Sequence, residues 1–235
     1  DFESASLLEK IQQAYVSIPG IPVPPPDCLP EEPLQAEKRL VVNGPGETTY
    51  LQLVYRAPAA REKDFFIFTI LDSLLTGPTS LNMFGGGGIS NKTSRLYRRL
   101  VEKEYAISVN GSLQATSDPF LYNINITVHP SRTAEEVLEQ VDKELAALQQ
   151  QPPTQSEVNR SAKQARALFA YGSENITNQA FWMGYSEMFA DHSWFTSYTT
   201  RLSQVKAEDV HRVLSTRLNT NQRVMGTYLP DGAQR

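Results

Sequence analysis

The stretch that decides the fold runs from residue 106 to residue 128 and reads AISVNGSLQATSDPFLYNINITV. Its second half alternates apolar with polar residues, which is the pattern of a strand with one buried and one wetter face. A Ser-Asp-Pro turn at residues 117–119 separates this strand from a first one over residues 106–116. The stretch therefore predicts a β-hairpin. The alternating apolar positions are Tyr122, Ile124, Ile126 and Val128.

After the hairpin, the sequence is mostly helical. Residues 133–136 and 154–157 both have the Thr-x-x-Glu spacing of a capping box, and each opens an amphipathic run. The helices that follow have apolar residues at helical spacing, and the chain closes on a run of strand composition. These later predicted elements are helices over residues 178–191, 194–202 and 207–218, and a strand over residues 223–229.

Before the hairpin, the sequence predicts two strands and a strongly apolar helix. Residues 39–42 and 48–55 have strand composition and flank a Gly-Pro-Gly turn at residues 44–46. The helix that follows Pro58 has little polar surface, which places it in the core. Strands, a helix, a hairpin, helices and a last strand predict an α+β fold, in which helices cover a mainly antiparallel sheet.

A proline-rich segment divides the chain near its start. Residues 3–16 have apolar side chains at helical spacing, and residues 18–26 (IPGIPVPPP) form an extended, semi-rigid spacer. We therefore predict that residues 1–35 are the terminal helix of a preceding domain plus a proline-rich linker, and that residues 36–235 are one α+β domain. A ligand for a proline-binding module is the alternative for the proline run. No signal peptide is visible in this fragment, so the compartment stays open.

The composition excludes several classes of function. The 22 basic and 26 acidic residues give a net charge of −4, and no basic stripe of the kind found in nucleic-acid-binding proteins is present. No apolar run approaches the ~20 residues that a membrane-spanning helix needs. Cys28 is the only cysteine, so no internal disulfide can form. The sequence predicts a soluble globular protein with no nucleic-acid partner and no membrane span.

The histidines offer little for catalysis. No two of His129, His192 and His211 have His-x-x-x-His spacing. Glu208 and His211 are one helical turn apart, but a catalytic zinc needs three protein ligands. The Asp-His-Ser run at residues 191–193 has the residue types of a catalytic triad, whose members normally meet through the fold rather than as neighbours. We predict no catalytic residue and no metal ligand in this chain.

A run of four glycines at residues 85–88 could bind substrate. It lacks the Gly-Lys-Thr of a phosphate-binding loop, but glycine backbone groups can approach an extended peptide closely. An inert connection is the alternative. For Arg95, Arg98 and Arg99, which follow the run, a solvated helix face is favoured over a carboxylate site. The residues predicted to bind substrate are Gly85, Gly86, Gly87, Gly88 and Asn91.

The glycine run and the Ser-Arg-Leu-Tyr sequence at residues 94–97 together resemble a signature of the pitrilysin/insulinase zinc metallopeptidases, which include mitochondrial processing peptidase. Residues 50–58 resemble the strand that opens the second half of these proteins. Residues 205–213 and 224–230 resemble a late helix and the closing strand of that half. The resemblance covers about residues 39–230, and the opening helix resembles the last turns of the family's first half.

The resemblance implies a role as one half of a clamshell. In that family, two α+β halves enclose a peptide, and the first half binds zinc through a His-x-x-Glu-His motif that this chain lacks. The chain therefore resembles the non-catalytic C-terminal half of a zinc metalloendopeptidase. It would enclose a peptide substrate, pair with a zinc-bearing half of the same chain, hold no cofactor and be inactive alone. A proteolytically inactive assembly subunit or a peptide-binding subunit of the same fold is the alternative.

The sequence departs from the family at an arginine and a tyrosine that support substrate binding near the zinc in many second halves. Val101 stands where the arginine would be, and Ile107 stands where the tyrosine would be. Tyr105 is two positions early and is a poor substitute, so we assign this role to no residue. The resemblance implies that a second subunit supplies the arginine–tyrosine pair, as in bacterial two-subunit members.

Overall fold

The computed structural model describes residues 2–22, 32–78 and 92–231. The chain forms two compact units, Asp1–Pro33 and Leu34–Arg235. The first unit contains helix α1 (Ser4–Tyr15), which buries none of its residues. Its apolar side chains are therefore left uncovered. These exposed residues include Leu7, Leu8, Ile11 and Tyr15.

The second unit is built on a five-stranded sheet with the order β1-β5-β2-β4-β3. The strands β2, β3, β4 and β5 pair in antiparallel fashion, and only β1 and β5 are parallel. The predicted hairpin is confirmed as β3 and β4, with an irregularity in the pairing between Ala106 and Ser108. The predicted α+β fold with a mainly antiparallel sheet is thereby confirmed. The strands are β1 (Lys38–Gly44), β2 (Tyr50–Ala57), β3 (Ala106–Leu113), β4 (Phe120–Val128) and β5 (Arg223–Pro230).

The first two strands form where the sequence predicts them, but they do not pair with each other, because β5 lies between them. The backbone N–H of Asp231 donates to the carbonyl of Gly44 at 2.8 Å, and the Tyr228 hydroxyl donates to the carbonyl of Pro45 at 2.8 Å. Both bonds fasten the end of β5 to the β1–β2 connection. Such pairing between the two ends of a chain leaves no local signal in the sequence.

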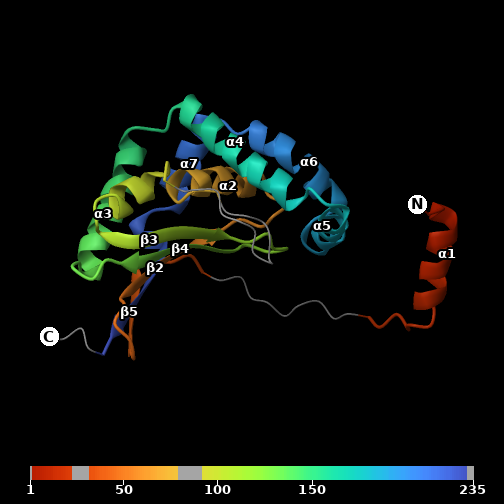
Figure 1. The fold of residues 1–235 in the computed structure, drawn as a ribbon, viewed down its shortest axis with the longest axis horizontal. Coiled ribbons are helices and arrows are strands. Elements are labelled where there is room, and N and C mark those ends of the chain that lie inside the picture. The colour runs from red at the N-terminus through yellow and green to blue at the C-terminus, as the bar shows by residue number, and fades with distance from the viewer. Residues whose placement is uncertain (1, 23–31, 79–91, 232–235) are drawn as a thin grey trace. The chain divides into compact units, whose positions relative to one another are not determined.

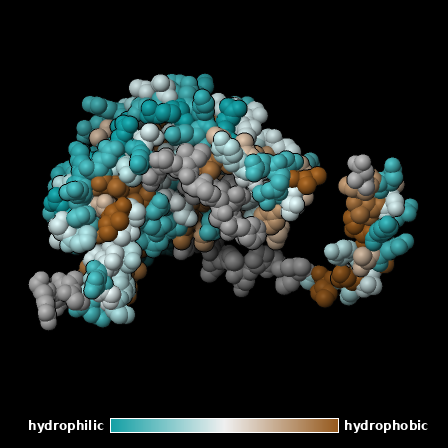
Figure 2. Space-filling model, viewed as in Figure 1, coloured by the Kyte–Doolittle hydropathy of each residue, from teal (hydrophilic) through white to brown (hydrophobic). Residues whose placement is uncertain are grey.

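The described helices of the second unit gather on one side of the sheet, and Figure 1 shows none of them over its other side. Both predicted capping boxes are confirmed, at Thr133 with Glu136 and at Thr154 with Glu157. Hydrophilic residues predominate on the outer surface around α4 in Figure 2. The helical elements are α2 (Lys63–Leu75), η1 (Tyr97–Val101), α3 (Ala134–Gln150), α4 (Gln155–Gly172), α5 (Ile176–Phe189), α6 (His192–Ser203), α7 (Ala207–Arg217) and η2 (Thr220–Gln222).

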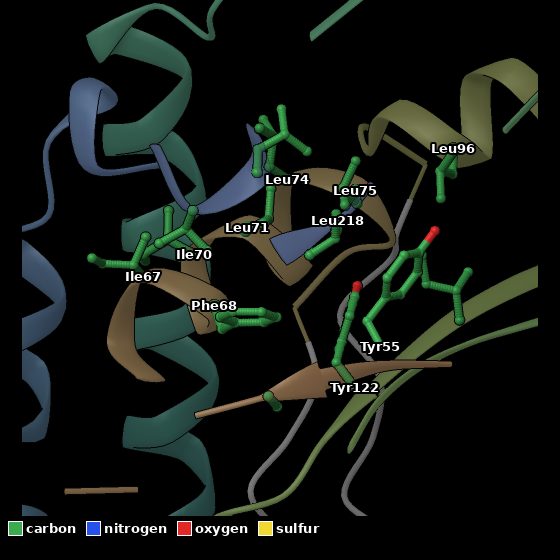
Figure 3. Close-up of a cluster of buried hydrophobic side chains, with 14 of the residues drawn as sticks. Tyr55, Ile67, Phe68, Ile70, Leu71, Leu74, Leu75, Leu96, Tyr122 and Leu218 are labelled. Atoms are coloured by element: carbon green, nitrogen blue, oxygen red, sulfur yellow. The ribbon is translucent and has the colours of Figure 1, made fainter. Parts of the chain in front are cut away.

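Helix α2 is the centre of the core, as its apolar composition predicts. It packs between the sheet and the outer helices, and the Phe68 ring meets the Tyr122 ring of β4 edge-on at 5.8 Å (Figure 3). The Tyr122 hydroxyl donates to the buried carboxyl of Asp72 at 2.8 Å, and the Thr76 hydroxyl donates to the same oxygen at 2.7 Å. Burial raises the pKa of Tyr122 well above its usual value, so this hydroxyl keeps its proton and remains a donor.

A second polar tie joins β5 to the helical layer. The Arg223 side chain is only 1% exposed and makes two hydrogen bonds to the Asp142 carboxylate of α3, at 2.6 and 3.2 Å. Its Nε donates to Glu37, just before β1, at 2.6 Å. Burial raises the pKa of Glu37, but hydrogen bonds from Arg39 and Arg223 outweigh it and leave the pKa below its usual value.

Candidate functional site

The side of the sheet that faces away from the helices, here called the open face, carries a row of carboxamides. The strand register places Asn110 of β3 beside Asn125 of β4, and Asn125 beside Gln52 of β2. The Gln52 side chain donates to the Asn125 side chain at 2.9 Å, and both side chains are exposed. A carboxamide carries two donor hydrogens and an acceptor oxygen, so this amide row (Gln52, Asn110 and Asn125) keeps bonding capacity for a ligand.

A row of hydroxyl-bearing side chains lies next to the amide row. Ser108 is paired with Thr127, and its hydroxyl donates to that of Thr127 at 3.0 Å. Thr127 lies beside Tyr50, whose ring lies 6.1 Å from the Tyr228 ring. The two aromatic rings provide flat apolar surface at the side of a polar strip. This combination suits a ligand that alternates amide groups with side chains.

A shallow hollow of about 410 Å³ lies over these two rows. Gly226 of β5 lies beside Gln52, and a Cβ atom added at Gly226 would meet nothing within 4 Å. The glycine therefore leaves open space above the middle of the sheet. None of the described residues that line this hollow carries a charge. The arrangement can hold a polar, uncharged chain by hydrogen bonds. Its described lining residues include no carboxylate, histidine, lysine or cysteine that could activate one of its hydroxyl groups.

The substrate-binding residues predicted from the sequence, Gly85, Gly86, Gly87, Gly88 and Asn91, all lie outside the described residues. The open face came from residues that the sequence analysis did not single out. Its signal was the polar half of the hairpin alternation, which the analysis had interpreted only as the wetter face. The row itself depends on the strand register, which sets Gln52, Asn110 and Asn125 side by side and leaves no local signal in the sequence.

The positions of the family's arginine and tyrosine carry no substitute for that pair. Val101 is half-buried and packs against the core, and Ile107 is an exposed aliphatic side chain. Tyr105 also packs against the core, and the Arg132 guanidinium lies 4.5 Å from the centre of its ring. One face of the Tyr105 ring is therefore covered by Arg132, which follows β4.

Each of the three histidines bonds to a different neighbour. His129 bonds to Ser131 at 2.8 Å, His192 to Glu187 at 3.2 Å, and His211 to the Gln149 carbonyl at 2.9 Å. Within residues 2–22, 32–78 and 92–231, no group of three or more histidine, cysteine or acidic side chains could hold a metal ion.

The Asp-His-Ser run at residues 191–193 does not form a triad. The Ser193 hydroxyl bonds directly to the Asp191 carboxylate, which also accepts from the backbone N–H of Trp194 at 3.1 Å as the cap of α6. The hydrogen bond from Ser193 is the main reason why the pKa of Asp191 lies below its usual value. His192 turns to Glu187 instead, so nothing activates the serine.

Comparisons with known proteins identify the fold. A family model described as the peptidase M16 inactive domain matches residues 1–165. A protease from Helicobacter pylori is 20% identical, with a TM-score of 0.83 over 98% of this chain and 54% of that one. A peptidase M16 inactive domain from Pseudomonas fluorescens is 19% identical, with a TM-score of 0.79 over 100% of this chain and 53% of that one. The periplasmic protease PqqL from Escherichia coli is 14% identical, with a TM-score of 0.70 over 98% of this chain and 24% of that one.

At these identities, the likeness to solved structures shows the fold alone. The chain spans about half the length of the first two of these structures and about a quarter of the third. No curated protein matches the chain in sequence. None of the helices in the described part of the chain is both long and apolar enough to cross a membrane.

Proposed function

This chain belongs to the M16 peptidases, the pitrilysin/insulinase family, as an inactive domain, and from that premise we propose that it is the C-terminal half of a zinc metalloendopeptidase. In this role it pairs with a zinc-bearing half and encloses a peptide substrate. The described residues do not fit a zinc site, so the metal and the hydrolysis belong to the other half. The chain alone is then inactive.

The observation that carries the proposal is the open face of the sheet. None of the described helices of the second unit lies over it, the described residues that line its hollow are uncharged, and the amide row crosses it. Gln52, Asn110 and Asn125 can exchange hydrogen bonds with the N–H and C=O groups of an extended peptide whatever its side chains are. Because this surface is uncharged, it favours contacts with the backbone of a peptide over contacts with any particular side chain. Such contacts suit a surface that encloses peptides of different sequence.

Three further assignments belong to the same proposal. Residues 1–35 are the terminal helix of a preceding domain plus a proline-rich linker, and residues 36–235 are the domain itself. The exposed apolar side chains of α1 support the first part, because such a helix needs a surface to cover it. The glycines of residues 85–88 and Asn91 contact the peptide. A second subunit supplies the arginine–tyrosine pair, since Val101 and Ile107 cannot.

The test uses the complete protease with its zinc-bearing half, a quenched fluorescent peptide and two matched variants. In Asn125→Ala an amide of the open face is lost. Asn159→Ala is the control, because it removes an amide on α4 that likewise accepts a hydrogen bond from a glutamine side chain, that of Gln155, at 2.8 Å. One peptide hydrogen bond contributes about 1 kcal/mol, so Asn125→Ala should raise KM about fivefold. Asn159→Ala should leave KM unchanged.

Two results would contradict the proposal. Equal kinetics in both variants would show that the open face does not touch the peptide. A natural complex that contains this chain but no zinc and cleaves no peptide would favour the alternative, a proteolytically inactive assembly or peptide-binding subunit of the same fold. If that complex binds an unlabelled peptide, the chain is a peptide-binding subunit, and if it does not, the chain is an assembly subunit.

A further inference from the structure

A second hollow lies on the helical side of the sheet, among η1, α3 and α4, and has a volume of about 350 Å³. We name it the cationic pocket, after the five basic side chains that line it. We propose that it binds a compact anion with at least two phosphoryl groups, such as pyrophosphate or triphosphate. The basic residues are Arg95, Arg98, Arg99, Lys103 and Arg160.

The two acidic residues of the pocket are already occupied. Arg95 lies 3.4 Å from Glu144 and forms a closer ion pair with Glu157. Glu157 also accepts from the backbone N–H of Thr154 at 2.9 Å and from its hydroxyl at 3.0 Å, as part of the α4 capping box. Burial raises the pKa of Glu157, but the bonds from Thr154 and the charge of Arg95 outweigh it, and the pKa lies below its usual value. The Glu157 carboxylate is therefore ionised and held in place by Thr154 and Arg95.

The other four cations make no ion pair with any described residue. These are Arg98, Arg99, Lys103 and Arg160. Together, the five cations and the two carboxylates of the pocket have a net charge of +3. The Nε atom of Arg99 is buried and has no hydrogen-bond partner among the residues that the structure describes. A buried donor without a partner is unusual in a folded protein, and an oxyanion in the hollow would supply the missing acceptor.

The net charge of the chain is −4, so the cluster does not follow from a basic composition. The sequence analysis favoured a solvated helix face for Arg95, Arg98 and Arg99. Arg98 is exposed, as that interpretation expects, whereas Arg95 forms ion pairs and Arg99 is half-buried in the wall of the hollow.

The kind of side chain selects the kind of anion. Three of the four unpaired cations are arginines, whose planar forks match two oxygens of a phosphoryl group at once. Converging cations from η1, its following turn and α4 can neutralise several charges, more than a single carboxylate or orthophosphate carries. A hollow of 350 Å³ is at the small end of ligand sites, which suits a compact ligand. The inference does not depend on the proposed peptidase role, because the open face lies on the other side of the sheet.

The experiment titrates the 235-residue chain with triphosphate, pyrophosphate, orthophosphate and citrate by calorimetry. The test variant is Arg98→Gln with Arg160→Gln. The control variant is Lys163→Gln with Arg166→Gln, which removes the same charge from a different hollow of α4. We expect triphosphate to bind at least tenfold more tightly than orthophosphate or citrate. The test variant should lose at least tenfold in affinity, and the control should retain it.

Thermal unfolding separates a binding site from a structural role. Without anion, the test variant should melt at or above the temperature of the unaltered chain, because like charges no longer repel each other. If the test variant does not fold, Lys103→Gln provides the same comparison, with an expected loss of at least threefold. The inference is overturned if no phosphoryl anion binds, if both variants weaken binding equally, or if citrate or an acidic peptide binds as tightly as triphosphate.

Discussion

Two glycine-to-alanine substitutions on opposite faces of the sheet should have opposite effects on stability. At Gly111 of β3, an added Cβ atom would lie 1.7 Å from a carboxyl oxygen of Asp72 and 2.5 Å from the hydroxyl of Thr76. At Gly226 of β5, it would meet nothing within 4 Å. The first position faces the helices, and the second faces the hollow of the open face. The chemical change is the same, so the pair compares only the two faces.

The cost at Gly111 follows from what holds Asp72 in place. This carboxyl is 2% exposed and receives hydrogen bonds from Tyr122 and Thr76. It cannot move aside without losing both bonds, at about 1 kcal/mol each. Overpacking adds about 1–3 kcal/mol. We therefore expect Gly111→Ala to lower the free energy of unfolding by about 3–5 kcal/mol. Gly226→Ala should raise it by about 0.5–1 kcal/mol, because alanine restricts the unfolded chain.

Urea unfolding followed by tryptophan fluorescence measures both values. The two tryptophans, Trp182 and Trp194, are buried in the helical layer, so their emission reports loss of the core. Circular dichroism of each folded variant serves as the control for secondary structure. A Gly111→Ala variant as stable as Gly226→Ala would refute the packing of α2 against β3 through Asp72. A Gly226→Ala variant destabilised by more than 1 kcal/mol would refute the uncovered state of the open face.

Three more outcomes can be measured on the same chain. Arg223→Met should lower the free energy of unfolding by about 2–3 kcal/mol, less than for a fully buried ion pair because Asp142 is partly exposed, and urea titration would show it. The pKa values of Glu37 and Glu157 are lowered, so the stability that these carboxylates contribute is present above about pH 4.3 and is lost as the pH falls through their folded-state values. Unfolding at pH 7 and pH 3 should therefore show a smaller acid loss in Glu157→Gln than in the unaltered chain. Dialysis against a chelator should leave the thermal midpoint unchanged, and a drop would reveal a bound metal.

The local patterns of the sequence were enough for most elements, because each depends on neighbours within a few residues. The hairpin alternation fixes which side chains of β4 are buried. The two Thr-x-x-Glu capping boxes place the starts of α3 and α4 within a residue. The helix after Pro58 is apolar on nearly every side, and the structure surrounds it with the sheet and the other helices.

The strand order was beyond local pattern. The last strand, β5, enters between β1 and β2 through contacts between residues almost 190 positions apart, such as Lys38 with Val224. The buried face of β5 carries Arg223, Met225 and Thr227, two of which are polar, so the composition of this strand does not indicate which strands flank it. The single parallel pair of β1 with β5 is likewise a consequence of topology rather than of composition.

The candidate sites were the hardest part to predict, because each is made of residues from separate elements. Asn110, Asn125 and Gln52 are ordinary polar positions of three strands until the register aligns them. The cationic pocket likewise combines η1 with Arg160 of α4, about 60 residues later. The arginine cluster was visible in the sequence, but its acidic neighbours, Glu144 and Glu157, were not. Because Glu144 and Glu157 are distant in the sequence, the arginine cluster alone indicated only a solvated helix face.

One short segment connects the two candidate sites, and its structure bears on whether they communicate. Lys103 of the cationic pocket is followed by Glu104, which has a positive φ of 55°, and then by Tyr105 and the start of β3. The backbone N–H of Tyr105 donates to the Leu100 carbonyl at 2.8 Å, and its carbonyl accepts from His129 at 3.0 Å. The segment is thus tied to η1 on one side and to the end of β4 on the other. Coupling between two sites needs an element with two discrete arrangements. A connection fixed at both ends offers none, so if both proposed sites exist, an anion in the cationic pocket should leave peptide binding at the open face unchanged.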